Sequence, residues 1–202
     1  MRDGKQVEHG LTTNRHSVKS VVAVTVCTTL LALAGLSSLT GFLIIRAGLY
    51  NVATTAPHGS AVYWLLHTTM RQSVKHRADG IAVPNGRGKN LAEGAGLFQD
   101  NCRRCHGAPG IAPDSFALGM MPAPPNLVQT AREWSPGEIY WTIRNGVKMT
   151  GMPGWQFRLD DAQIWSLVAF ISCLPKISPE DYRSGTANAN GRGKDAWVSL
   201  CR

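Results

Sequence analysis

The chain has 202 residues, a formal net charge of +8 and five cysteines, a length that suits one ordinary domain with appendages. The cysteine spacing is not that of a disulfide-rich scaffold. The basic excess lies outside residues 91–175, which carry six Lys/Arg and seven Asp/Glu. Because nucleic-acid binding needs a basic face on the folded module, we expect no nucleic-acid partner.

The first predicted element is a transmembrane helix at residues 21–45, which contain no ionisable group other than Cys27. At 1.5 Å per residue this segment would be about 37 Å long, enough to span a hydrocarbon core of roughly 30 Å. The alternative is a cleaved signal peptide, since residues 32–34 before Gly35 have the small-x-small form of a cleavage site. The apolar run continues past that point, which favours an uncleaved membrane anchor.

The orientation of this helix follows from its flanking cations. Four Lys/Arg occur in residues 1–20, whereas the twenty residues after the span contain only Arg46. By the positive-inside rule, the N-terminus is cytoplasmic and the remainder of the chain lies on the other side of the membrane.

Residues 46–90 read as a linker that contains an amphipathic helix and ends in a Gly-rich link at residues 84–90. The apolar side chains recur at helical spacing, and cations accumulate toward the C-terminal end, where the helix dipole favours them. We expect this helix to lie on the membrane, on the domain that follows, or on a partner subunit. The residues of the predicted apolar face are Val62, Leu65, Leu66, Thr69, Met70, Ser73 and Val74.

The most informative motif is Cys102-Arg103-Arg104-Cys105-His106, which has the Cys-x-x-Cys-His spacing of covalent c-type haem attachment. Two thiols on one helical turn can each add to a vinyl group of the same porphyrin, and the histidine can then bind the iron. The alternatives are a dithiol redox pair, which would need a βαβ pattern, and a zinc site, which would need a second pair of ligands. Neither supporting pattern occurs. We therefore predict one haem c with Cys102, Cys105 and His106 as binding residues.

Bacteria attach c-type haem outside the cytoplasm, so the motif agrees with the orientation given by the cations. The sequence predicts a single-pass protein of the bacterial inner membrane with a periplasmic haem domain.

The chain from residue 91 onward resembles the class I c-type cytochromes. Gly94, Phe98 and Cys102 are each four residues apart, as in the N-terminal helix of that family, and this spacing places them on one helix face. Residues 160–174 resemble the family's C-terminal helix, in which Phe170 would meet Gly94. The resemblance implies an all-α fold, with a small cytochrome c-like haem domain after the transmembrane helix, and His/Met ligation of the iron.

Met152 is the predicted sixth ligand, because Thr150-Gly151-Met152-Pro153 is similar to the distal-ligand loop of this family. A soft thioether favours ferrous iron and raises the reduction potential. Met149 and Met121 are the competing methionines.

A ligating imidazole normally donates its other N–H to a carbonyl. The sequence Pro124-Pro125-Asn126-Leu127 looks like the family segment whose proline carbonyl has this role. The resemblance thus assigns Pro125 to His106, with Pro124 as a near alternative.

The C-terminal residues have a composition that predicts no buried core, so we expect a flexible tail. Cys173 and Cys201 could pair in an oxidising compartment, although Cys173 also suits a small core residue. The predicted parts are a cytoplasmic N-terminus (1–20), an anchor (21–45), a linker (46–90), the cytochrome domain (91–175) and the tail (176–202).

Iron held by His106 and Met152 has no vacant position, so the predicted function is single-electron transfer, without catalytic residues. The expected partners are the membrane and redox proteins such as a periplasmic dehydrogenase, a quinol-oxidising complex or a terminal oxidase. Arg103 and Arg104 would steer acidic partners. The alternatives are a haem enzyme or gas sensor with a displaceable sixth ligand, and a structural or assembly subunit of a respiratory complex.

Overall fold

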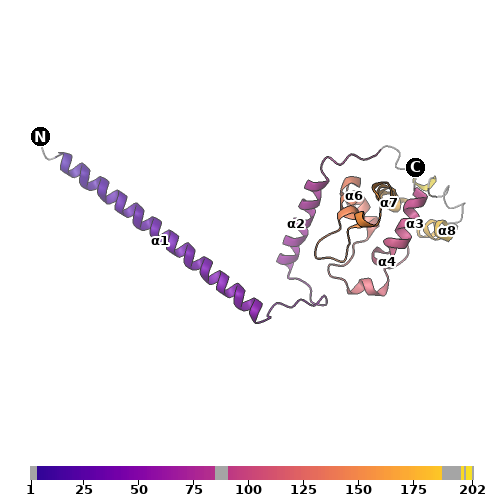
Figure 1. The fold of residues 1–202 in the computed structure, drawn as a ribbon, viewed down its shortest axis with the longest axis horizontal. Coiled ribbons are helices and arrows are strands. Elements are labelled where there is room, and N and C mark those ends of the chain that lie inside the picture. Colours follow the sequence, from indigo (N-terminus) through magenta and orange to yellow (C-terminus); the bar gives the residue numbers. More distant parts are fainter. Residues whose placement is uncertain (1–3, 85–90, 188–196, 198, 202) are drawn as a thin grey trace. The chain divides into compact units, whose positions relative to one another are not determined.

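The computed structural model describes residues 4–84, 91–187, 197 and 199–201, and the chain divides into two compact units, residues 1–52 and 53–202. Every regular element among the described residues is a helix, apart from one isolated bridge between Ala108 and Ile111 (Figure 1). The predicted all-α fold is therefore confirmed. Residues 85–90 of the predicted Gly-rich link lie outside the described part of the chain.

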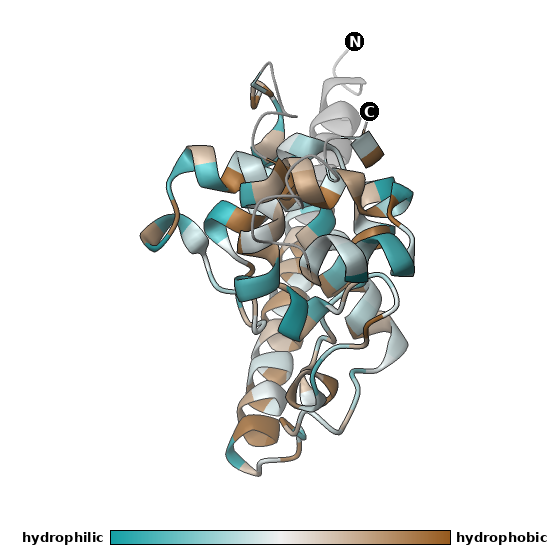
Figure 2. Cartoon of the chain, turned by 90° about the vertical axis from the view of Figure 1, so that its right-hand side faces the viewer, coloured by the Kyte–Doolittle hydropathy of each residue, from teal (hydrophilic) through white to brown (hydrophobic). Residues whose placement is uncertain are grey.

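The first unit contains one continuous helix, α1 (Gly4–Arg46). Its portion Val18–Arg46 is long and apolar enough to cross a membrane, and it includes the predicted span. The large apolar side chains there are exposed, for example Leu31 at 73% and Ile45 at 78%, and Figure 2 shows mostly brown and pale residues along this helix. Such a surface is suited to a lipid environment.

The second unit is organised by the crossing of α3 (Leu91–Asn101) and α7 (Asp161–Cys173). At Gly94 the backbones are so close that an added Cβ would lie 2.1 Å from the Ser166 carbonyl oxygen and 3.0 Å from the Phe170 Cβ. Phe98 and Phe170 are fully buried beside this point, with ring centroids 5.4 Å apart. The predicted contact between Gly94 and Phe170 is confirmed.

Several helices of this unit begin at side chains that cap them. Asn126 caps α5 (Leu127–Glu133), and Ser135 and Glu138 form a capping box at the start of α6 (Pro136–Asn145). A second capping box begins α7. These caps satisfy backbone N–H groups that have no partner within the helix. The other elements of this unit are α4 (Arg103–His106), η1 (Ser115–Gly119), η2 (Trp155–Phe157), η3 (Leu174–Lys176) and α8 (Pro179–Ala187).

The predicted helix of the linker is α2 (Ser60–Ala78), and its C-terminal half packs against α6. Val74 and Ala78 are buried there, Arg71 forms an ion pair of 3.3 Å with Glu138, and its guanidinium lies 4.0 Å from the centre of the Trp134 ring. In the N-terminal half the predicted apolar face is not covered by the domain, because Val62, Leu65 and Leu66 are 42–57% exposed. These residues lie beyond the part of α2 that packs against the domain.

The C-terminal residues differ from the predicted flexible tail. Tyr182 on α8 is fully buried and Trp197 is 3% exposed, and both rings pack against the α3–α7 core. A disulfide joins Cys173 to Cys201, which shows that the pairing left open by the sequence is formed. The polar composition of the segment did not indicate this packing. The segment is attached by two isolated aromatic side chains and one disulfide, and it contains no apolar run that would have predicted burial. Residues 188–196 of the predicted tail lie outside the described residues.

The close packing at Gly94 leads to a first prediction. Gly94→Ala should lower the free energy of unfolding by about 2 kcal/mol or more, because its Cβ would collide with backbone atoms that cannot move independently. Gly96→Ala on the same helix meets open space and should be neutral or stabilising by about 0.5–1 kcal/mol. Urea unfolding in detergent, followed by circular dichroism, measures both. Equal effects of the two substitutions would contradict the crossing.

The disulfide leads to a second prediction. Cys201→Ser should lower the free energy of unfolding by about 3 kcal/mol, since the bond closes a loop of 28 residues and restricts the unfolded chain. Cys27→Ser, at an exposed cysteine of α1, is the matched control and should leave stability unchanged. A Cys201→Ser variant as stable as the wild type under the same urea titration would show that the C-terminal attachment does not depend on the bond.

Candidate haem attachment site

The attachment turn begins where α3 ends. The Cys102 N–H donates to the Phe98 carbonyl at 2.9 Å, and the N–H groups of Cys105 and His106 donate to the Cys102 carbonyl at 3.1 and 3.0 Å. These bonds hold the three predicted residues on one turn, next to the core ring of Phe98. Neither Cys102 nor Cys105 is in a disulfide, so both thiols are available for thioether formation.

The two cysteines differ in their surroundings. Cys102 is 6% exposed, and burial, with a smaller effect of Cys105, raises the pKa of its thiol to about 12. Cys105 is half-buried. The buried thiol therefore stays protonated at neutral pH until a thioether bond replaces its proton.

A hydrogen bond to the backbone sets the tautomer of His106. Its Nδ1 lies 2.8 Å from the Pro125 carbonyl oxygen, and because a carbonyl can only accept, Nδ1 must donate and carry the proton. Burial lowers the pKa of His106, opposed by this hydrogen bond, so the ring is neutral at pH 7. Nε2 consequently keeps a free lone pair, as a metal ligand requires.

The Pro125 carbonyl is itself fixed by its neighbour. Asn126 accepts the Val128 N–H through its side chain at 2.8 Å and so sets the start of α5. Of the two prolines considered from the sequence, the structure gives Pro125 the hydrogen bond to His106.

The loop after the attachment turn is fastened by Asp114. Its carboxylate lies 2.9 Å from the Arg104 Nε and 3.6 Å from an Arg103 Nη, and its N–H donates to the Arg104 carbonyl at 2.8 Å. These pairs partly neutralise the two arginines that the sequence suggested for partner steering. Their main structural effect is to hold the loop against the motif.

The predicted methionine loop follows α6 and is closed at both ends. The Val147 N–H donates to the Met152 carbonyl at 3.2 Å. A Cβ at Gly146 would lie 2.6 Å from the Gly154 nitrogen, so only glycine permits this close approach. Within the loop, the Thr150 hydroxyl donates to the Val147 carbonyl at 2.8 Å and accepts the Met152 N–H at 3.1 Å.

The candidate methionines are distinguished by burial. Met152 is half-buried and packs against the core, whereas Met149 is 98% exposed and Met121 is 37% exposed. The structure also brings Met120 to this loop, since a Cβ at Gly151 would lie 1.8 Å from the Met120 terminal methyl. No local pattern predicts that approach, because it joins two loops distant in sequence.

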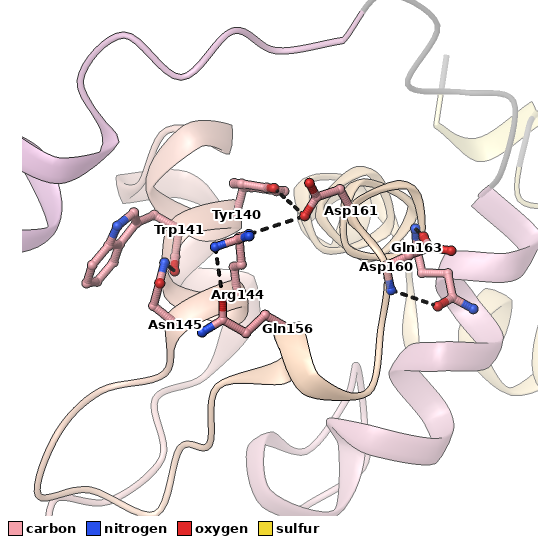
Figure 3. A network of polar contacts seen from close by, with 8 residues as sticks. All are labelled: Tyr140, Trp141, Arg144, Asn145, Gln156, Asp160, Asp161 and Gln163. Atoms are coloured by element: carbon pink, nitrogen blue, oxygen red, sulfur yellow. Dashed lines mark hydrogen bonds and ion pairs between the residues drawn. The ribbon is translucent and has the colours of Figure 1, made fainter.

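A polar network holds the residues after the methionine loop. The Tyr140 hydroxyl and the Arg144 Nε donate to one Asp161 oxygen at 2.7 and 3.2 Å, and Arg144 also reaches the Gln156 side chain at 2.9 Å (Figure 3). The Tyr140 hydrogen bond and then Arg144 lower the pKa of Asp161, so the carboxylate is charged at neutral pH. The network ties α6, η2 and α7 together around the loop that carries Met152.

These donors fit a covalently bound iron porphyrin. Two unpaired thiols and a neutral imidazole occupy one turn, and a half-buried thioether occupies a restrained loop. A nitrogen and a soft sulfur ligand form the donor set of low-spin haem iron.

Comparisons with known proteins agree with this chemistry. Residues 89–171 match the family described as cytochrome C oxidase, cbb3-type, subunit III. The chain is 34% identical over 111 residues to the cbb3-type cytochrome c oxidase subunit CcoP of Azospirillum brasilense, a match covering 52% of this chain and 36% of that protein. The chain thus spans little more than a third of this relative's length. No solved structure matches it. The motif and these matches show a c-type cytochrome domain.

The Thr150 hydroxyl leads to a third prediction. Thr150→Val removes two hydrogen bonds of the methionine loop. If the predicted ligand Met152 binds the iron, imidazole should replace it in the ferric protein with about tenfold higher affinity, because the loop loses about 1–1.5 kcal/mol of stabilisation. Thr150→Ser keeps the hydroxyl and should behave as the wild type. Spectroscopic titration with imidazole measures the affinity, and unchanged binding in Thr150→Val would show that the loop does not restrain the ligand.

Proposed function

We propose that this c-type cytochrome is a membrane-anchored monohaem protein that transfers single electrons. One haem c would be attached through Cys102 and Cys105, with His106 and Met152 as iron ligands. The observation that carries the proposal is the His106 Nδ1–H donated to Pro125, because it leaves Nε2 free on the same turn as both thiols. Bound haem c supplies a one-electron ferric–ferrous couple.

The surroundings of the ligands favour electron transfer over catalysis. Met152 lies in a loop that is closed by the hydrogen bond from the Val147 N–H to its own carbonyl and by the close approach of Gly146 to Gly154. The residues after the loop are joined to α6 by the hydrogen bond between Arg144 and Gln156. A restrained sixth ligand fills the position that oxygen or peroxide would need. The haem-enzyme or sensor alternative needs a displaceable ligand and is less well supported.

The membrane anchor and its direction are part of the same proposal. Residues 21–45 of α1 would span the bilayer, with residues 1–20 in the cytoplasm and the cytochrome domain in the periplasm of a bacterial inner membrane. The Cys173–Cys201 disulfide supports an oxidising compartment for the domain. Residues 46–90 would act as the linker, and the domain would extend from residue 91 beyond Pro175 to Cys201.

The partners are proposed from the domain's chemistry and from its relative. CcoP is named as a subunit of a cbb3-type cytochrome c oxidase, and we infer that this chain likewise passes electrons within a terminal oxidase or another respiratory complex. A periplasmic dehydrogenase or a quinol-oxidising complex would be a suitable electron donor. A structural or assembly subunit would need the fold but not the iron ligands.

A fourth prediction tests the ligand and the function together. Met152→Ala should keep its covalent haem but lose the methionine-to-iron charge-transfer absorption, and the reduced protein should bind carbon monoxide rapidly because the sixth position is open. Absorption spectroscopy of the full chain in detergent measures both.

Met149→Ala and Met120→Ala are the matched controls and should keep the absorption of the wild type. If Met120→Ala loses it instead, the distal ligand is assigned wrongly. If respiration is unaffected by Met152→Ala, the structural-subunit alternative gains over electron transfer.

A further inference from the structure

The helix α2 has two chemically different halves. From Val62 to Leu66 five successive residues are apolar or aromatic and 42–66% exposed. From Met70 onward one side of the helix faces the domain and the other side is exposed to solvent. From the first to the fifth of these residues the helix turns through about 400°, more than a full turn. The apolar surface therefore surrounds the helix instead of forming one face.

The exposed turns are held in a defined direction relative to the cytochrome domain. The other end of α2 is fixed by buried Val74 and Ala78 and by Arg71, which pairs with Glu138 and lies over Trp134. Because α2 is one uninterrupted helix, its first turns project rigidly from the packed half.

Three observations favour a lipid bilayer as the occupant. Residues 47–59, which join α1 to α2, span at most about 45 Å when extended, so this short connection keeps the apolar turns within reach of the membrane that α1 would cross. Tyr63 and Trp64 are the side chains that concentrate at bilayer interfaces. Apart from Arg71, which is paired with Glu138, the helix carries Lys75 and Arg77 and no Asp/Glu, a charge that complements anionic headgroups.

A bilayer also suits the shape of this surface better than a protein partner does. A protein groove covers one side of a helix, whereas lipid can surround an inserted helix end. We propose that residues 61–66 insert into the interfacial region of the bilayer and so dock the cytochrome domain on the membrane in one orientation. This inference rests on the proposed membrane anchor, and it adds a second, reversible contact to it.

Photo-crosslinking of the full chain tests the inference. Benzoylphenylalanine replaces Leu65 in one variant and Leu66 in another, and each haem-loaded protein is irradiated in nanodiscs containing anionic lipid and in native membranes. We expect lipid adducts, identified by mass spectrometry, at a yield severalfold above that of the same probe at Gln72, which is exposed on the polar half of α2. The haem absorption of each variant shows that it is folded.

A probe at Leu33 of α1 separates this proposal from the anchor on which it rests. Without lipid adducts at Leu33, the transmembrane assignment fails. With lipid adducts at Leu33 but only the Gln72 background at Leu65 and Leu66, the docking proposal is overturned and the anchor stands. Protein adducts in place of lipid adducts at Leu65 and Leu66 in native membranes would also overturn it, with a partner subunit as the occupant.

Discussion

The close crossing of α3 and α7 at Gly94 is the constraint on which the cytochrome domain depends. With no side chain at this position, the two backbones meet, and Phe98 and Phe170 fill the space beside them. The same helix face continues to Cys102, whose N–H is bonded to the Phe98 carbonyl. The crossing thus fixes the position of the proposed attachment turn, because that turn is a direct continuation of the packed helix.

Each proposed iron ligand is held by hydrogen bonds of its own side chain or backbone. On one side, the Pro125 carbonyl determines which His106 nitrogen is protonated. On the other, the Thr150 hydroxyl and the glycines at the loop ends confine Met152. Ligands restrained in this way need little rearrangement when the iron changes oxidation state, which is the property that an electron carrier requires.

Two segments outside the resemblance to known cytochromes are attached to this core by different physical means. The C-terminal segment is joined by a disulfide and by Tyr182 and Trp197, both buried. The linker helix α2 is joined by a small apolar contact and by the ion pair between Arg71 and Glu138. A buried ion pair adds little net stability, because desolvation offsets its attraction, but separating its partners is costly. Such a contact therefore fixes the direction of α2 more than it stabilises the domain.

Residue spacing along the chain is enough to specify the local features. The Cys-x-x-Cys-His turn, the apolar helix and the face shared by Gly94 and Phe98 are all set by residues within a few positions of one another, where helix geometry dictates the outcome. The assignments of Pro125 and Met152 rest on the family resemblance, and the hydrogen bond between Pro125 and His106 agrees with the first of them.

The folded structure, and not the spacing of residues, establishes which parts of the chain meet over long distances. It joined Cys173 to Cys201, buried two aromatic residues of a polar segment, brought Met120 beside Gly151, and packed only half of α2. The physical reason is that composition and periodicity report the averaged environment of a segment. Burial of a single side chain depends instead on whether another element supplies a complementary surface at that position.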